Sequence, residues 1–280
     1  MQNKSSDLVE NTDRSRKTTI AHARRSFLLG SAALGVAVAA NVIGSTSAEA
    51  SRRRRRRRWR RRRGNNPTCF VAGTHLRTPT GNQVVEHLNV GDEICLADGT
   101  VQRIKWVGRM AFQRQDDGSW DIDTLPFVVK RGAIDGHAPE ADLYVSGDHR
   151  LFIDGLLIPV RHLENGVSIA RAKDMPGDEI AYFHIELDMH TAVLANGLPA
   201  ETLQGGHVRR HFDNFADYAA LYGDESPMLA AFAPIVGLNG GRETVSSHMR
   251  SAIAPVYDMR QPLDVIRDDL AIQASHRVAI

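Results

Sequence analysis

Between residue 69 and residue 203, short apolar runs alternate with polar turns about every ten residues. Gly, Asp and Asn separate these runs, as at Asp98-Gly99 and Asp154-Gly155. A two-residue alternation between frequent turn formers predicts short β-strands, and we see no long helical period in this stretch. The strands are expected within residues 75–78, 93–96, 101–107, 127–129, 143–145 and 182–187. The pattern therefore predicts a mainly β, compact module of many short strands over residues 69–203.

Residues 204–280 follow a different pattern, with apolar positions at helical spacing. One such stretch covers residues 212–221 and is followed by Gly223, a typical helix stop; another covers residues 263–272 and begins after Pro262. We expect these apolar faces to pack on the β module, although they could also bind a partner. The end of the chain is thus expected to be a partly helical C-terminal extension.

The distribution of charge adds a second division. The whole chain has a formal net charge of +2, but residues 1–68 hold 17 Lys and Arg against 4 Asp and Glu, whereas residues 69–280 hold 18 against 29. A basic leader therefore precedes an acidic body.

Two cysteines, Cys69 and Cys95, make no disulfide framework, although a bond between them is conceivable in an exported protein. Cys95 alternates with apolar neighbours and is expected in the core, and we expect no metal or cofactor.

The first 50 residues are typical of an export signal. A polar stretch ends in Arg24-Arg25-Ser26-Phe27-Leu28, an apolar run rich in Ala and Gly covers residues 27–43, and Ala48-Glu49-Ala50 is a small-x-small cleavage signal. This arrangement resembles a twin-arginine signal, which implies the twin-arginine translocation machinery as a partner and cleavage near Ala50. We therefore expect an exported protein, in the periplasm or outside the cell. The alternative is a membrane anchor through residues 27–43, a short run for a span.

Eleven arginines surround Trp59 between Arg52 and Arg63. Like charges repel and each guanidinium needs water or an anion, so residues 51–68 are predicted to be a disordered flank. The tract should bind polyanions through bidentate contacts and counterion release, without sequence readout. It could instead be a solvated linker, or it could lie on the acidic body of the same chain.

Four motifs of the β module resemble one known family when taken in their order. They are Cys69-Phe70-Val71-Ala72-Gly73-Thr74, then Val85-Glu86 with Val90-Gly91-Asp92-Glu93-Ile94, then Ser146-Gly147-Asp148-His149, and finally Phe183-His184-Ile185-Glu186-Leu187 with His190 and Val193-Leu194-Ala195-Asn196-Gly197. Together they resemble a bacterial branch of the Hint domain, the self-cleaving module shared by inteins and hedgehog autoprocessing domains. The resemblance covers about 135 residues and implies the compact β fold of that family.

The resemblance implies chemistry at the Thr68–Cys69 peptide bond. The Cys69 thiolate would attack the Thr68 carbonyl and convert the peptide bond into a thioester. His149 would protonate the leaving amine. Ser146, in place of the usual Thr, would hydrogen-bond the twisted amide or the developing oxyanion. His190 is a further candidate, although it could simply pack beside its strand.

Departures from the intein pattern argue against splicing. An intein ends in His-Asn followed by Cys, Ser or Thr, whereas residues 198–203 contain neither His nor Asn. His184 falls where inteins often carry an Asp that serves the C-terminal step. We therefore expect cleavage alone, with the thioester resolved by water, a thiol, an amine or an alcohol. The sequence does not identify this acceptor.

These observations divide the chain into an export signal (1–50), an arginine-rich flank (51–68), a Hint-like β domain (69–203) and a C-terminal extension (204–280). The favoured function is a single-turnover autoprocessing reaction in cis that releases or transfers the arginine-rich flank. The competing interpretation is an exported protein that binds polyanions or a membrane surface and carries an inactive Hint-like domain.

Overall fold

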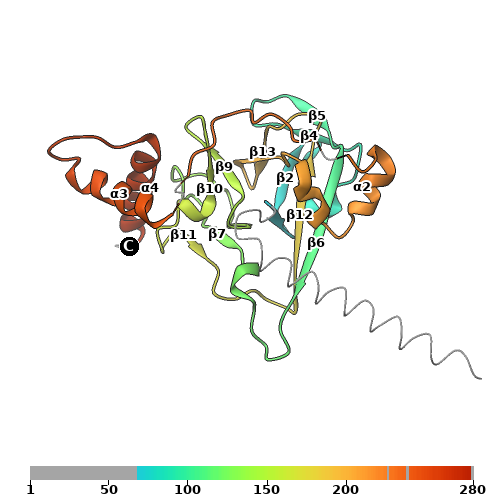
Figure 1. The fold of residues 1–280 in the computed structure, drawn as a ribbon, viewed down its shortest axis with the longest axis horizontal. Coiled ribbons are helices and arrows are strands. Elements are labelled where there is room, and N and C mark those ends of the chain that lie inside the picture. Colours follow the sequence, from blue (N-terminus) through green and yellow to red (C-terminus); the bar gives the residue numbers. More distant parts are fainter. Residues whose placement is uncertain (1–67, 226, 238–239, 279–280) are drawn as a thin grey trace, which may run out of the picture. The chain divides into compact units, whose positions relative to one another are not determined.

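The structure, a computed structural model, describes residues 68–225, 227–237 and 240–278 (Figure 1). The expected export signal with Arg24, Arg25 and Ala50 lies outside the described residues, as does the arginine tract 52–63. Within the described ranges the protein is mainly β, and its three α-helices all follow the last strand. The predicted fold class is confirmed for this part of the chain. None of its helices is both long and apolar enough to cross a membrane.

Six antiparallel strands form the first sheet, in the order β11-β7-β8-β1-β12-β6. Strand β1 is short, but it lies inside the sheet because it pairs with β12 on one side and with β8 on the other. Phe70 is the partner of both Phe183 and Val145. The bounds are β11 Ile169–Arg171, β7 Phe127–Val129, β8 Leu143–Val145, β1 Phe70–Val71, β12 Glu179–Glu186 and β6 Trp106–Gln113.

The second six-stranded sheet has the order β10-β9-β14-β13-β2-β3, and β4 and β5 form a separate pair. The bounds are β10 Leu156–Pro159, β9 Arg150–Ile153, β14 Leu198–Glu201, β13 Ala192–Ala195, β2 His75–Thr78, β3 Gly81–Val84, β4 Glu93–Cys95 and β5 Val101–Arg103. Short 3-10 turns connect several strands: η1 Val85–His87, η2 Ile122–Thr124 and η3 Val160–His162.

Residues 101–107 do not form the single strand that the alternation predicted. The backbone N–H of Ile104 donates to the Asp92 carbonyl, whereas that of Lys105 donates to the Glu186 carbonyl. The chain therefore changes its pairing partner between these two residues, and β6 begins at Trp106. Alternation in the sequence shows that a segment is extended, but it does not show with which strand the segment pairs.

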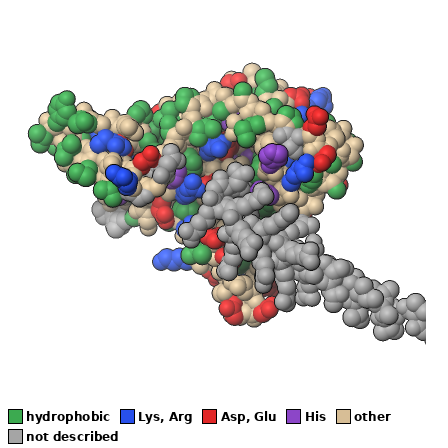
Figure 2. All heavy atoms as spheres, viewed as in Figure 1, with side chains coloured by type: hydrophobic (Ala, Val, Ile, Leu, Met, Phe, Trp, Pro, Cys, Tyr) green, Lys and Arg blue, Asp and Glu red, His purple; other side chains and the backbone are tan. Residues whose placement is uncertain are grey.

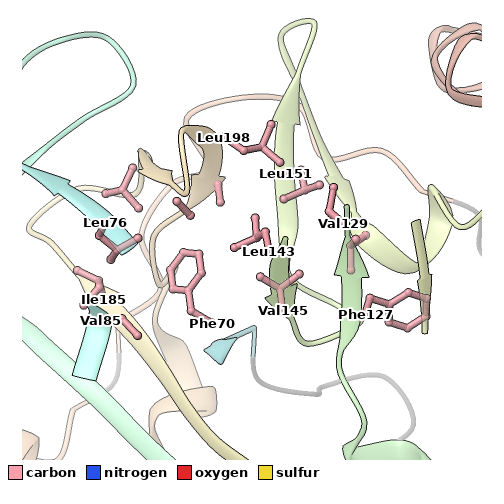
Figure 3. Close-up of a cluster of buried hydrophobic side chains, with 14 of the residues drawn as sticks. Phe70, Leu76, Val85, Phe127, Val129, Leu143, Val145, Leu151, Ile185 and Leu198 are labelled. Carbon is pink, nitrogen blue, oxygen red and sulfur yellow. The ribbon is translucent and has the colours of Figure 1, made fainter. Parts of the chain in front are cut away.

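Two clusters of buried side chains lie on opposite sides of β1. The larger cluster draws on both six-stranded sheets, and Figure 3 shows the Phe70 ring between Leu76 and Val85 on one side and Leu143 and Val145 on the other. Because successive side chains of a strand point to opposite faces, the neighbours of Phe70 join the smaller cluster instead. That cluster contains Cys69, Val71, Trp106, Met110, Tyr182, Phe212 and Tyr218 among others.

Cys95 was expected in the core, and this prediction is wrong. On the three-residue strand β4 the buried position belongs to Ile94, and Cys95, the next residue in the alternation, is only half-buried. The described cysteines are both free thiols.

The C-terminal extension packs on the β module, as predicted. Its first segment, η4 (Gly206–His211), carries the fully buried Arg209, whose Nε lies 2.6 Å from Oε2 of Glu186 and whose Nη2 lies 2.9 Å from Oε1. Helix α2 (Phe215–Tyr222) ends at Gly223, which has a φ of 79°. Phe212 and Tyr218 complete the smaller cluster. The bidentate ion pair attaches the segment to β12, and the ring contacts of Phe212 and Tyr218 with Trp106 attach it to β6.

Helix α4 (Pro262–Val278) contributes Leu263, Ile266 and Leu270 to the larger cluster. Helix α3 (Gly241–Ile253) was not predicted, and it joins α4 through the buried Ser247, whose hydroxyl donates to Asp264. Most of its apolar side chains are exposed, and in Figure 2 hydrophobic side chains gather over α3 and the loop that follows it.

Candidate active site

The Thr68–Cys69 peptide bond immediately precedes β1, and it is hydrogen-bonded to the end of β8. The backbone N–H of Cys69, which belongs to this peptide bond, donates to Oγ of Ser146 at 2.8 Å. In return, the N–H of Ser146 donates to the Cys69 carbonyl at 2.9 Å. The pairing of Phe70 with Val145 explains this arrangement, because the next residues along two antiparallel strands again face each other. The structure thus brings together Cys69 and Ser146.

His149 is carried to the same place by a tight turn after β8. Its backbone N–H donates to the Ser146 carbonyl at 2.9 Å. The ring is fully buried, and its centroid lies 4.3 Å from that of Phe70. Within the described part of the chain, neither ring nitrogen has a hydrogen-bond partner of normal geometry. A buried imidazole in this condition is exceptional and is available for a transient proton.

Burial sets the protonation states of this site. It lowers the pKa of His149 to about 4, an effect that the Glu201 carboxylate and the backbone of Cys69 partly oppose. Burial also raises the pKa of the Cys69 thiol well above its ordinary value. The charged forms lose hydration that the protein does not replace, so both groups are neutral near pH 7.

His190 lies in a neighbouring ion-pair network. Its Nε2 is 3.1 Å from Oε2 of Glu201, and Nη1 of Arg150 lies 2.8 Å from the same oxygen. The other oxygen of Glu201 accepts the backbone N–H of Arg150 at 3.1 Å, directly after His149 in the chain. Among the described residues, the hydrogen bond of His190 leads to Glu201 and not to Cys69. His190 therefore supports the backbone next to His149 rather than the cleaved bond.

The structure adds one residue that the motifs did not assign to the first step. His184, on β12, is fully buried, and its Nε2 lies 3.2 Å from Oγ1 of Thr68. Its ring is 5.0 Å from that of His149, at an interplanar angle of 89°. Burial lowers the pKa of His184 well below its ordinary value, and the neighbouring imidazoles of His149 and His190 add to the effect. The contact follows from the pairing of β1 with β12, which the sequence does not reveal.

Asp92 and four further histidines of the β module lie outside this group of residues. Asp92 makes a turn hydrogen bond, because its Oδ2 accepts the N–H of Asn89 at 2.8 Å. His75, His87 and His137 are exposed, and His162 is half-buried. In residues 68–225, 227–237 and 240–278, no group of three or more His, Cys, Asp or Glu side chains is placed to hold a metal ion.

The family model of the Hint domain matches residues 68–207, a stretch that contains Thr68, Cys69, Ser146, His149 and His184. Three solved structures are similar to parts of this chain. They are an intein-like domain from Clostridium thermocellum (14% identity, 49% of this chain, 100% of that chain, TM-score 0.36), a DnaB intein from Synechocystis sp. PCC 6803 (10%, 49%, 99%, 0.32) and the gp41-1 intein (12%, 48%, 98%, 0.34). The search of curated proteins returned no match.

Proposed function

Because the chain belongs to the Hint domain family, we propose that it cleaves its own Thr68–Cys69 peptide bond through an N-to-S acyl shift, once per molecule and in cis. The family fold is consistent with autoprocessing. The observation that carries the proposal is the hydrogen bond between the N–H of that peptide bond and Oγ of Ser146, beside the buried ring of His149.

In the first step the sulfur of Cys69 attacks the carbonyl carbon of Thr68, so the C–S bond forms as the C–N bond breaks. One proton must leave the sulfur, and one must reach the nitrogen. A neutral His149 is too weak an acid to protonate the leaving nitrogen, so it acts first as a base toward the thiol and then, as imidazolium, as an acid toward that nitrogen. The reaction thereby moves one proton from sulfur to nitrogen and needs no other reactant.

The fold supports this step by positioning the thiol of Cys69 next to the carbonyl of Thr68. The nucleophile and its target belong to adjacent residues, so the fold needs only to hold them in the reactive geometry. Ser146 holds Cys69 through two hydrogen bonds. Its Oγ accepts the N–H of Cys69 at 2.8 Å, and its backbone N–H donates to the Cys69 carbonyl at 2.9 Å. The hydroxyl of Ser146 therefore orients the amide nitrogen that becomes the leaving group.

The later steps of splicing have no counterpart in the proposal. An intein would end in His-Asn, whereas residues 198–203 contain neither, and the Glu201 carboxylate within them is already engaged by Arg150 and His190. The thioester is therefore resolved by an external acceptor, which is water, a thiol, an amine or an alcohol. The products are a protein that begins at Cys69 and an arginine-rich flank, which is released or transferred to the acceptor.

The proposal includes the fate of the leader. We infer export by the twin-arginine route through Arg24 and Arg25, removal of the signal near Ala50, and subsequent release of residues 51–68 in the periplasm or outside the cell. The arginine tract Arg52–Arg63 would then bind polyanions.

The test is the intact mass of the full-length chain and of two variants, with and without a small thiol. The wild type and Cys95→Ala should yield a fragment that begins at Cys69, and thiol should accelerate its appearance. Cys69→Ala should remain intact. Cys95→Ala is the matched control, because Cys95 is the other thiol and is half-buried. If all three chains remain intact between about pH 6 and pH 9, the alternative of a polyanion-binding protein with an inactive Hint-like domain replaces the proposal.

A further inference from the structure

The side chain of Thr68 is held by a buried histidine. Thr68 supplies the carbonyl carbon that the proposed reaction attacks, and its hydroxyl oxygen lies 3.2 Å from Nε2 of His184. Thr68 is half-buried, whereas His184 is fully buried. The contact joins residues 116 positions apart, so only the pairing of β1 with β12 creates it.

The position of the His184 ring is set by its neighbours. It contacts the ring of His149 at 5.0 Å and that of Phe70 at 5.7 Å. Because these rings belong to the buried interior, the imidazole of His184 cannot move away from Thr68 without leaving a void. Its Nε2 is thus a fixed polar atom that faces the residue before the cleaved bond.

A fixed polar atom in a buried place favours one class of side chain. A hydroxyl at position 68 satisfies Nε2, whereas an apolar side chain would leave it without a partner, which costs free energy. Threonine is also stiff about χ1, so holding its Oγ1 restrains its Cα, to which the attacked carbonyl carbon is bonded. The contact therefore orients the electrophile, as the hydrogen bonds of Ser146 orient the leaving nitrogen.

We propose that His184 is a positioning residue that selects a hydroxyl-bearing side chain, Thr or Ser, immediately before the cleaved bond. This inference rests on the proposed function and adds a determinant of its specificity. His184 takes no proton in the reaction, so its loss slows cleavage without abolishing it.

The kinetic test uses four variants of the full-length chain and the rate at which the fragment beginning at Cys69 appears. Thr68→Ser keeps the hydroxyl and should cleave within about twofold of the wild-type rate. Thr68→Val keeps the shape and loses the hydroxyl, and His184→Phe keeps a ring and loses Nε2. Each should be slower by about fivefold to tenfold. The double variant Thr68→Val/His184→Phe should be no slower than the slower single variant, because both changes remove one contact.

A second readout does not depend on cleavage. In full-length Cys69→Ala, which stays uncleaved, the ¹⁵N resonance of His184 Nε2 should shift on Thr68→Val and should stay in place on Thr68→Ser. This comparison leaves His184 itself unchanged, so it decides the question even if His184→Phe does not fold.

The outcomes separate the two proposals. If Thr68→Val cleaves at the wild-type rate and leaves the Nε2 resonance in place, His184 has no positioning role. The proposed function still stands in that case. A double variant whose slowing is the product of the two single effects overturns it as well. A full-length wild type that never cleaves overturns the proposed function and, with it, the selection at Thr68.

Discussion

Lowering the pH from 7 to 5 should destabilise the folded chain, and His149 should account for a large part of this loss. Its ring is fully buried, and its pKa is lowered from 6.5 to about 4, mainly by burial. Since the folded pKa is lower than the unfolded one, the unfolded chain binds a proton more readily between these values. The free energy of unfolding is therefore unaffected above pH 6.5 and falls as the pH drops toward 4.

The magnitude follows from these two pKa values. Proton linkage gives a loss of about 2 kcal/mol between pH 7 and pH 5 for a single histidine whose pKa falls from 6.5 to about 4. The pKa values of His184 and His162 are also lowered, the latter to about 4, so both add losses of the same sign. A comparison of variants must therefore isolate the part that belongs to His149.

Urea unfolding of two full-length proteins at pH 7 and pH 5 provides that comparison. Cys69→Ala prevents cleavage, and Cys69→Ala/His149→Phe also removes the titrating ring while keeping an aromatic contact with Phe70. His184 and His162 are present in both proteins, so their contributions largely cancel. The loss of unfolding free energy should be smaller in the His149→Phe protein by about 2 kcal/mol. Equal losses in the two proteins would refute the assignment of a buried, neutral His149.

Three further predictions concern the surroundings of the site. Ser146→Ala removes the acceptor of the cleaved N–H and should slow cleavage about tenfold to a hundredfold, whereas Ser146→Thr should stay within about fivefold, as measured by intact mass. Glu201→Gln removes the buried charge opposite Arg150 and should lower the free energy of unfolding by about 3 kcal/mol, and an unchanged urea midpoint would contradict this. Gly108→Ala would place Cβ 2.7 Å from Cδ1 of Phe212 and should cost about 1–3 kcal/mol in the same assay; wild-type stability would show that the ring can move aside.

The local pattern of the sequence was sufficient for the fold class and for part of the site. Period-two alternation and turn formers predict β-strands because each is a property of a few neighbouring residues. The helix stop at Gly223 is local in the same sense, and the structure ends α2 there. Motif spacing identified Cys69, Ser146 and His149 as candidates, and the structure places the last two on one turn after β8.

The register and pairing of distant strands were decided only by the tertiary structure. The contact of His184 with Thr68 depends on the alignment of β1 with β12 across 116 positions, and no local propensity determines that alignment. The same holds for the bidentate pair of Arg209 with Glu186, which attaches the C-terminal extension. The pKa of His149 is likewise a property of its surroundings, because the sequence shows an imidazole but only packing removes its water. The sequence by itself thus determined which groups are available for chemistry, whereas burial and strand pairing decided their protonation and their partners.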